Sequence, residues 1–306
     1  MKKLFFLFAV IFNAANMMAD NYMIDSVYHY YSFKDTACLN KTINQYNSIG
    51  QKIQSDSYYI QGGKWKKGRV STYEYTSNGL LEKSTDIIES KDGISYSQKL
   101  YRYKDTLAIL IEDRFQRNNE EWKTTGYIES EYNNQNLLIR KSHMNSKLYE
   151  WSREQYLYDP AGNNVQMDIY EWSDGEFKVS VRHTFLYNEN NLLIQEKTYV
   201  ADKLSDQVTY EYDANNFLIQ RIYYIEFQGI LHPSSKIEFL NNKEGRAIKS
   251  FSYSNLDFKG KFILQTKTEN TYDSNGNLTS TTHMGYINGT WYPLSNSDER
   301  WIYYYK

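Results

Sequence analysis

The sequence predicts an all-β protein: an antiparallel meander of about nine two-stranded hairpins, coiled into one strongly twisted sheet. Aromatic residues make up 17% of the chain, with 31 tyrosines and three prolines, a composition that suits half-buried strands and spares the hydrogen bonds between them. A motif also recurs every thirty residues or so, which is typical of stacked repeats. Because twist accumulates over so many strands, closure as a barrel or as propeller-like blades is the alternative.

Residues 1–19 are predicted to be a secretory signal peptide. Lys2 and Lys3 precede the apolar stretch LFFLFAVIF, which is too short to span a bilayer, and cleavage is expected after Ala19 or Ala15. Residues 20–306 are predicted to form a single repeat array, with an N-terminal cap over 20–45, repeats over 46–302 and the end of a closing strand over 303–306. We therefore expect an exported protein that is periplasmic, secreted or at the cell surface.

The stretch YDSNGNLTS, residues 272–280, is the clearest copy of the repeat. The fourth residue after its opening tyrosine is Gly276, and glycine and asparagine are the residues that accept a positive φ at little cost. A left-handed residue there closes a short loop, so each copy is expected to join the two strands of a hairpin. Comparable copies open at Tyr46, Tyr75, Tyr103, Tyr132, Tyr158, Tyr187 and Tyr212. The fourth residues of the regular copies are Gly50, Gly79, Asn136, Gly162, Asn191, Asn216 and Gly276.

Two copies depart from this pattern. The unit opened by Tyr103 has Leu107 at the fourth position, and an imperfect copy opens near Leu240 and delays its glycine to Gly245. After the turn, a β-branched residue recurs three positions past the Gly or Asn, which favours a return strand. These residues are Ile53, Ile139, Val165, Ile194, Ile219 and Ile248.

An aromatic residue follows the second turn of several units, ten residues before the opening tyrosine. It is Trp65, Trp122, Phe177 or Phe262. Because ten is even and side chains alternate along a strand, an uninterrupted strand places this aromatic residue and the tyrosine on the same face of the sheet.

The segments YDSNGNLTS, YDPAGNN and YDANNFL resemble the tyrosine–aspartate repeat of the YD or RHS type. Over nearly the whole mature chain, the longer unit with its NGTWYP segment is similar to an uncharacterised family, a domain of unknown function, of secreted repeat proteins from gut bacteria of the Bacteroides kind. The resemblance implies an exported β-sheet protein of unknown function. It brings no catalytic residue with it.

The remaining composition argues against several classes of function. The net charge is −2 with interspersed signs, which gives no basic footprint for nucleic acid. A single cysteine, Cys38, cannot form an internal disulfide and is expected to be a small buried residue. No histidine pair has metal-ligand spacing, the YDSNGN loop lacks the further acids of a calcium loop, and no nucleophile motif is present. We expect no enzyme activity, no cofactor and no metal, and a chain that does not span the membrane.

The aromatic surplus is the feature that points to a function. The tripeptide YEW occurs twice, and it makes Tyr149, Trp151, Tyr170 and Trp172 candidate ligand-binding residues. Such rings either cover sheet surface through cross-strand pairs or line a groove for glycan or peptide. A structural protein that assembles through edge strands such as the C-terminal WIYYYK is the alternative, and a glycan hydrolase with two facing carboxylates is less favoured.

Overall fold

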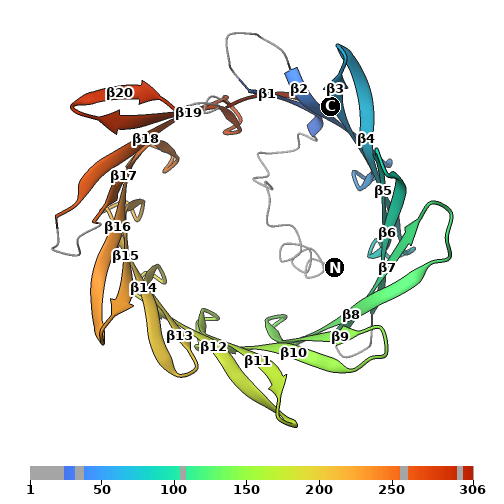
Figure 1. Cartoon of the computed structure of the whole chain (residues 1–306), viewed down its shortest axis with the longest axis horizontal. Coiled ribbons are helices and arrows are strands. Elements are labelled where there is room, and N and C mark those ends of the chain that lie inside the picture. Colours follow the sequence, from blue (N-terminus) through green and yellow to red (C-terminus); the bar gives the residue numbers. More distant parts are fainter. Residues whose placement is uncertain (1–23, 32–37, 104–107, 256–260, 295–298, 306) are drawn as a thin grey trace.

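The computed structural model describes residues 24–31, 38–103, 108–255, 261–294 and 299–305, whose regular structure is all β strand in one antiparallel sheet (Figure 1). The strands are β1 (Ile24–Tyr31), β2 (Cys38–Tyr46), β3 (Lys52–Gln61), β4 (Lys64–Tyr75), β5 (Leu81–Ser90), β6 (Gly93–Tyr103), β7 (Ala108–Arg117), β8 (Lys123–Tyr132), β9 (Leu138–Asn145), β10 (Glu150–Tyr158), β11 (Asn164–Ser173), β12 (Glu176–Tyr187), β13 (Leu193–Val200), β14 (Lys203–Tyr212), β15 (Leu218–Phe227), β16 (Ile230–Asn241), β17 (Ala247–Ser254), β18 (Ile263–Tyr272), β19 (Leu278–Ile287), β20 (Thr290–Pro293) and β21 (Glu299–Tyr305). The predicted signal peptide, Leu107 and the side chain of Cys38 lie outside what the structure describes.

The predicted meander is confirmed, because each strand from β1 to β19 pairs antiparallel with the next along the chain. The sheet bends round a ring (Figure 1), so that β21 comes to lie beside β1 and pairs with it from Ile24–Tyr305 to Tyr31–Glu299. On its other side β21 meets β19 through the pairs Ser280–Arg300 and Thr281–Glu299. The junction between β19 and β21 is therefore short.

The left-handed turns are also confirmed. In the turn between β18 and β19, Asp273 Oδ1 accepts hydrogen bonds from the backbone N–H groups of Asn275 (2.9 Å) and Asn277 (2.8 Å), and Gly276 has a φ of 84°. The Asp side chain thus replaces the partners that the turn backbone lacks. Positive φ is found at the matching residues Gly50, Gly79, Asn136, Gly162, Asn191, Asn216 and Gly245.

We call the residue that ends the strand before each of these turns the anchor. Asn241, not Leu240, is the anchor of the imperfect copy, and this corrects the alignment at that unit. Gly245 is the fourth residue after Asn241, and Asn242 Oδ1 accepts from the backbone of Glu244 and Arg246 as Asp273 does in its own turn. The glycine is therefore not delayed. The hydrogen bonds of the turn, rather than an aromatic ring, define the position.

Six of the anchor tyrosines tie their unit to the preceding one through their hydroxyl groups. The hydroxyl of Tyr187 donates to the carbonyl of Asn164 (3.0 Å), which is the residue paired with the previous anchor, Tyr158. Equivalent bonds run from Tyr75 to Lys52, Tyr103 to Leu81, Tyr158 to Leu138, Tyr212 to Leu193 and Tyr272 to Ala247, and from the Asn241 amide to Leu218. Burial raises the pKa of the Tyr103 hydroxyl to about 12, so these phenols stay protonated donors.

The recurring β-branched residues are the extra residues of β-bulges. Tyr187 pairs with Leu193 and Leu186 with Gln195, so Ile194 has no partner across the strand. The same register shift leaves out Ile53, Glu82, Ile139, Val165, Ile219, Ile248 and Thr279. A bulge next to each turn adds local twist, which helps to bend the sheet.

A second bulge, seven residues before the anchor, makes the prediction of a shared aromatic face wrong. Ile169 pairs with Val181 and Tyr170 with Val179, so Ser180 is the extra residue, and its hydroxyl donates to the Ile169 carbonyl (3.2 Å). Other units have the same shift, at Gly68, Thr125, Trp151, Ser205, Ser234 and Gln265. Beyond an extra residue, each side chain lies on the face of the sheet opposite to the one that simple alternation predicts.

The contacts confirm this inversion. Arg153 stands five residues before the anchor Tyr158, on the face without the anchors, and its guanidinium lies 3.8 Å from the centroid of the Phe177 ring. Phe177 therefore belongs to the opposite face from Tyr187. In the same way Lys41, five residues before the anchor Tyr46, lies over the ring of Trp65 at 4.8 Å. We call the two faces the anchor face and the opposite face.

Adjacent turns touch through the fifth residue after each anchor. The Phe217 ring lies over Gly245, where a Cβ would come within 2.6 Å of it, and the Arg246 guanidinium lies over Gly276. Gln51 instead donates to the carbonyl of Gly79 (2.9 Å). Glycine at Gly245 and Gly276 therefore serves both the left-handed φ and the close approach of the neighbouring turn.

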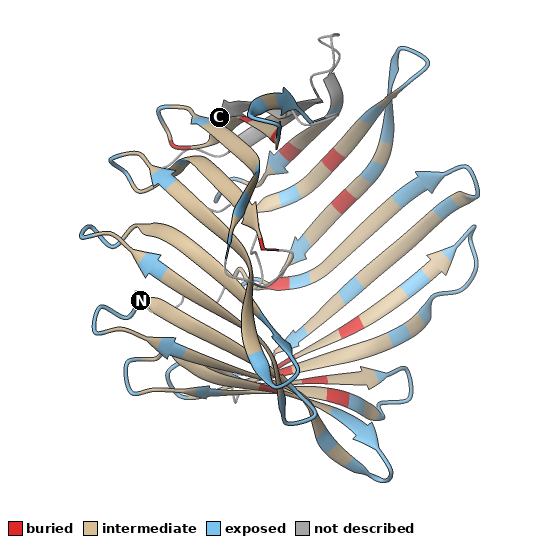
Figure 2. Ribbon diagram, turned by 60° about the vertical axis from the view of Figure 1, so that its left-hand side comes forward, coloured by how far each residue is buried: buried red, intermediate tan, exposed pale blue. Residues whose placement is uncertain are grey.

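The sheet is a single layer with two half-buried faces, as the predominance of intermediate exposure shows (Figure 2). Among the described residues, Leu81 and Ile109 are the buried large apolar side chains, whereas the buried polar ones include Asp56, Glu112 and Asp168. Stability in such a layer rests on strand pairing, cross-strand side-chain pairs and the anchor bonds rather than on one central core.

We expect the Gly162→Val variant to lose about 1–2 kcal/mol or more of unfolding free energy, because Gly162 has a φ of 89° and a β-branched residue is strained there. The Gly162→Asn variant is the matched control, since Asn136, Asn191 and Asn216 hold the same place with φ between 58° and 64°, and it is expected to stay close to wild type. Urea unfolding of the three proteins measures the difference. Equal stability of the Val and Asn variants would contradict the assignment of the turn.

Candidate functional site

Four tyrosines stand at equivalent positions on every second strand of the opposite face. Tyr170 lies on β11, Tyr199 on β13, Tyr224 on β15 and Tyr253 on β17, and all four are half-buried. Each pairs across the strand with the residue five positions before an anchor. Strands lie about 4.8 Å apart, so successive rings in this cross-strand tyrosine row are spaced about 9.5 Å.

Polar side chains alternate with these rings. The cross-strand partners of the four tyrosines are Arg153, Arg182, Gln207 and Lys236, in chain order. Lys236 Nζ lies 4.4 Å from the centroid of the Tyr253 ring, a distance typical of a cation–π contact. The row therefore presents an apolar ring face and a hydrogen-bond donor in each two-strand repeat.

Carboxylates on the same face hold these cations in place. Arg182 donates to both oxygens of Asp168, at 2.7 and 3.0 Å, and Asp168 is 5% exposed. The hydrogen bond that Arg182 donates to Asp168 raises the pKa of Arg182, so its charge is fixed. At the next cation, Lys236 lies 2.6 Å from Glu238, which also accepts from the hydroxyl of Tyr253 at 2.7 Å. A guanidinium tied by two bonds presents its remaining donors in a fixed direction.

The row continues toward the hairpin end of β11 and β12 with a second aromatic pair. Trp172 is 55% exposed and contacts Phe177 edge to face, with 5.1 Å between ring centroids. Arg153 also lies over the Phe177 ring and is held by Glu150 at 2.7 Å. An exposed indole beside a fixed guanidinium offers a flat apolar surface with a polar edge.

The structure divides the four candidate residues between two places. Tyr170 and Trp172 lie on the opposite face and belong to the row. Trp151 contacts the ring of His143 (5.8 Å between centroids), which reaches Glu154 on the anchor face, four residues before Tyr158. Tyr149 is 67% exposed in the turn that joins β9 to β10. The YEW repeat thus places its two copies in different surroundings, because Trp151 is itself a bulge residue.

Sequence reasoning missed Tyr199, Tyr224 and Tyr253, together with Arg182 and Lys236. The available signal was the residue five positions before each anchor, which is Lys41, Arg153, Arg182, Lys236 or Lys267 in five of the units. Its cross-strand partner could not be identified without the register that the bulges set.

Buried carboxylates elsewhere on the opposite face are held ionised by basic partners. Burial alone would raise the pKa of Asp56, but hydrogen bonds from Lys67 and Gln54 outweigh it, and the net shift is downward. Glu112 behaves alike: burial opposes hydrogen bonds from Arg114 and Thr124, and its pKa is lowered. A group kept ionised in this way acts as an acceptor rather than as a proton donor.

The anchor face carries a cluster of polar groups at β9 and β10. His143 Nε2 lies 3.0 Å from Glu154 Oε1, Lys141 Nζ lies 3.2 Å from the same oxygen, and the Tyr156 hydroxyl donates to Glu154 Oε2. The hydrogen bond from His143 lowers the pKa of Glu154 to about 2, with burial opposing and Tyr156 and Lys141 adding to the shift. Burial and the neighbouring Glu154 raise the pKa of Tyr156. One carboxylate thus ties three side chains together.

In the part of the chain that the structure describes, no group of three or more His, Cys, Asp or Glu side chains could hold a metal ion. The same residues include no helix able to cross a membrane.

No protein-family model and no curated protein matches the chain. Among solved structures it is similar to a porin-like protein from Bacteroides uniformis, with 12% identity, a TM-score of 0.31 and coverage of 92% of this chain and 96% of that one. A porin-like protein from Bacteroides vulgatus has 11% identity and a TM-score of 0.25, covering 93% and 99% of the two chains. A protein of unknown function from Bacteroides fragilis has 12% identity and a TM-score of 0.14, covering 61% and 94%. At these values the likenesses carry no argument about function.

We expect Glu154 to make stability depend on acid pH. Its folded-state pKa of about 2 lies below the ordinary value of 4.5, so the ionised carboxylate stabilises the fold above pH 4.5, and this contribution is lost as the pH falls toward 2. At pH 7 the Glu154→Gln variant should be less stable by on the order of 2 kcal/mol. The difference from wild type should shrink between pH 4.5 and 2.

Urea unfolding at a series of pH values measures this dependence. The Glu189→Gln variant, in an exposed turn, is the control for removing one negative charge. A constant difference between wild type and the Glu154 variant across the acid range would contradict the assignment.

Proposed function

We propose that this protein is an exported, non-enzymatic binding module that holds an extended glycan across β11 to β17 on the opposite face. The observation that carries the proposal is the cross-strand tyrosine row. Its four rings are about 9.5 Å apart, and the strand between two successive rings carries a polar side chain. Sugar rings stack their apolar faces on aromatic side chains while their hydroxyls bond to the polar groups nearby.

The spacing supports a chain ligand laid across the strands. An extended chain of β-linked hexoses advances by a comparable distance every two residues, so one platform meets every second sugar. A polyproline helix, at 3.1 Å per residue and three residues per turn, has a similar repeat. The glycan is favoured because Arg182, Gln207 and Lys236 offer a donor in each repeat, which suits a ligand covered with hydroxyl groups.

The absence of catalysis is part of this proposal. Glycosidases need one carboxylic acid with a raised pKa to protonate the leaving group. The pKa of Asp56, Glu112, Glu154 and Glu238 is instead lowered by basic or hydroxyl partners. These shifts support a ligand-holding or structural role for the carboxylates.

Assembly through the terminal strands finds less support. Residues 301–305 of the WIYYYK segment belong to β21, which pairs with β1 inside the chain. On that side its edge is occupied and does not recruit a second copy.

Export is proposed from the sequence of residues 1–19. Sequencing the N-terminus of the protein recovered from cell fractions tests it, and a mature chain that begins at residue 16 or 20 is the expected result. An intact Met1 on a protein found in the cytoplasm would contradict it.

The glycan site is tested by titrating soluble β-linked hexasaccharides and a polyproline peptide against the Tyr224→Ala variant. We expect a hexasaccharide to bind wild type, and its Kd to rise about tenfold when one stacking ring is removed. The Tyr58→Ala variant is the matched control, because Tyr58 pairs with Lys41 at the equivalent position on β3, away from the row. Binding of the peptide alone, or equal loss in both variants, would contradict the proposal.

A further inference from the structure

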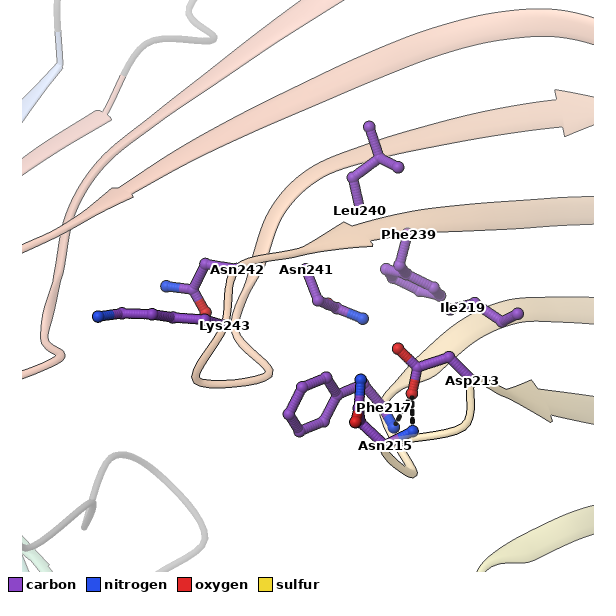
Figure 3. Close-up of a pocket in the computed structure, with 9 residues that line it drawn as sticks. All are labelled: Asp213, Asn215, Phe217, Ile219, Phe239, Leu240, Asn241, Asn242 and Lys243. Atoms are coloured by element: carbon purple, nitrogen blue, oxygen red, sulfur yellow. Dashed lines mark hydrogen bonds between the residues drawn. The ribbon is translucent and has the colours of Figure 1, made fainter.

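A recess lies between two neighbouring turns, the one from β14 to β15 and the one from β16 to β17 (Figure 3). It has a volume of about 700 Å³, within the range of about 300–1,000 Å³ usual for small-molecule sites. Phe239 stands two residues before the anchor Asn241 and therefore lies on the anchor face, so the recess is separate from the cross-strand tyrosine row. Its lining residues are Asp213, Asn215, Phe217, Ile219, Phe239, Leu240, Asn241, Asn242 and Lys243.

The recess coincides with Asn241, the one anchor that is not a tyrosine in the part of the chain that the structure describes. The Asn241 amide donates to the Leu218 carbonyl at 2.8 Å, the same bond that the Tyr212 hydroxyl makes to Leu193 at 2.9 Å. The carbonyl is therefore satisfied without a phenol ring. Asn241, whose side chain is smaller than a tyrosine, lines the recess beside Phe239.

Two phenyl rings form apolar walls of this recess. Phe217 takes the position that holds Gln51, Leu80, Leu137, Asn163 or Leu192 in other units. Its ring is fixed because it lies over Gly245 of the next turn, with no room even for a Cβ between them. The Phe239 ring lies 5.7 Å from the Arg221 guanidinium. Both rings project toward the recess in Figure 3.

Polar groups stand at its mouth. Asp213 Oδ1 accepts from the backbone N–H groups of Asn215 and Phe217, each at 2.9 Å, and these bonds fix the direction of the carboxylate. Asn215 and Lys243 also line the recess, but the Lys243 side chain extends away from it, with its ammonium 3.5 Å from Glu244 (Figure 3). A carboxylate accepts from one hydroxyl and a neighbouring amide NH2 donates to the next, which matches adjacent hydroxyls on a sugar ring.

We propose that this recess binds a single hexopyranose ring, stacked on Phe217 or Phe239 and hydrogen-bonded at Asp213. The inference goes beyond the glycan row, because it places a second site on the anchor face for one sugar rather than for a chain. A pyranose has the flat apolar face that a phenyl wall accepts and the hydroxyls that the polar mouth requires.

Methyl glycosides of glucose, galactose, mannose and N-acetylglucosamine are the probes, titrated by calorimetry. The Asn241→Tyr variant restores the residue found at the other anchors and should fill the recess. We expect at least one glycoside to bind wild type and to lose measurable binding to this variant, whose melting temperature is unchanged or higher. The Phe217→Leu variant, which has the residue of three other turns, should raise the Kd about tenfold.

Hexasaccharide binding to the same variants separates this site from the row. Retained hexasaccharide binding in the Asn241→Tyr variant shows that the fold is intact and that the loss belongs to the recess. If the hexasaccharide does not bind wild type, the glycan row is refuted, and this inference is then tested by glycoside binding alone. The inference is overturned if no glycoside binds wild type, if phenol binds in their place, or if Asn241→Tyr binds as wild type does.

Discussion

The hydrogen bond from an anchor side chain to a carbonyl of the preceding unit, made by Asn241 and six anchor tyrosines, is the interaction on which the array depends. A one-layer sheet cannot draw its stability from a deep apolar core, and it must also fix the order in which its hairpins meet. Tyr187 does both through one hydroxyl, because its acceptor Asn164 is the residue already paired with the previous anchor. The left-handed turn makes this possible by returning the chain directly after the anchor. The contact of Phe217 with Gly245 likewise joins one turn to the next.

The turns and hairpins could be predicted from the sequence, whereas the face of the sheet on which distant side chains lie could not. Glycine or asparagine at positions such as Gly162 and Asn191 is a direct consequence of positive φ, so the turns and the hairpins follow from residue type. The alignment near Leu240 is wrong by one residue because the anchor of that unit, Asn241, is not a tyrosine. The hydrogen-bonding ability that matters is also present in Asn241.

The face assignment failed for a different reason. A bulge at Ser180 or Thr125 adds one residue without breaking the apolar pattern, so the sequence count stays even while the side chains change sides. Serine and threonine hydroxyls at these sites donate to carbonyls of the partner strand. No short sequence motif predicts this role. For the same reason Tyr170 and Trp172 could be chosen as ligand residues from their exposed aromatic character, but their alignment with Tyr199 and Tyr224 depends on a register that only the fold supplies.

Apart from the unit opened by Tyr103, whose strand pairs have no register shift, the two bulges of a unit also set apart a segment of constant length. Between the bulge at Ser234 and the anchor Asn241 lie six residues, and the same holds between Ser205 and Tyr212. Everything beyond the bulge, including the outer hairpin loop, can gain or lose residues without moving the side chains inside that frame. An array of this kind can therefore diversify at its rim while the inner register is inherited unchanged, which separates the part of the chain open to variation from the part that specifies assembly.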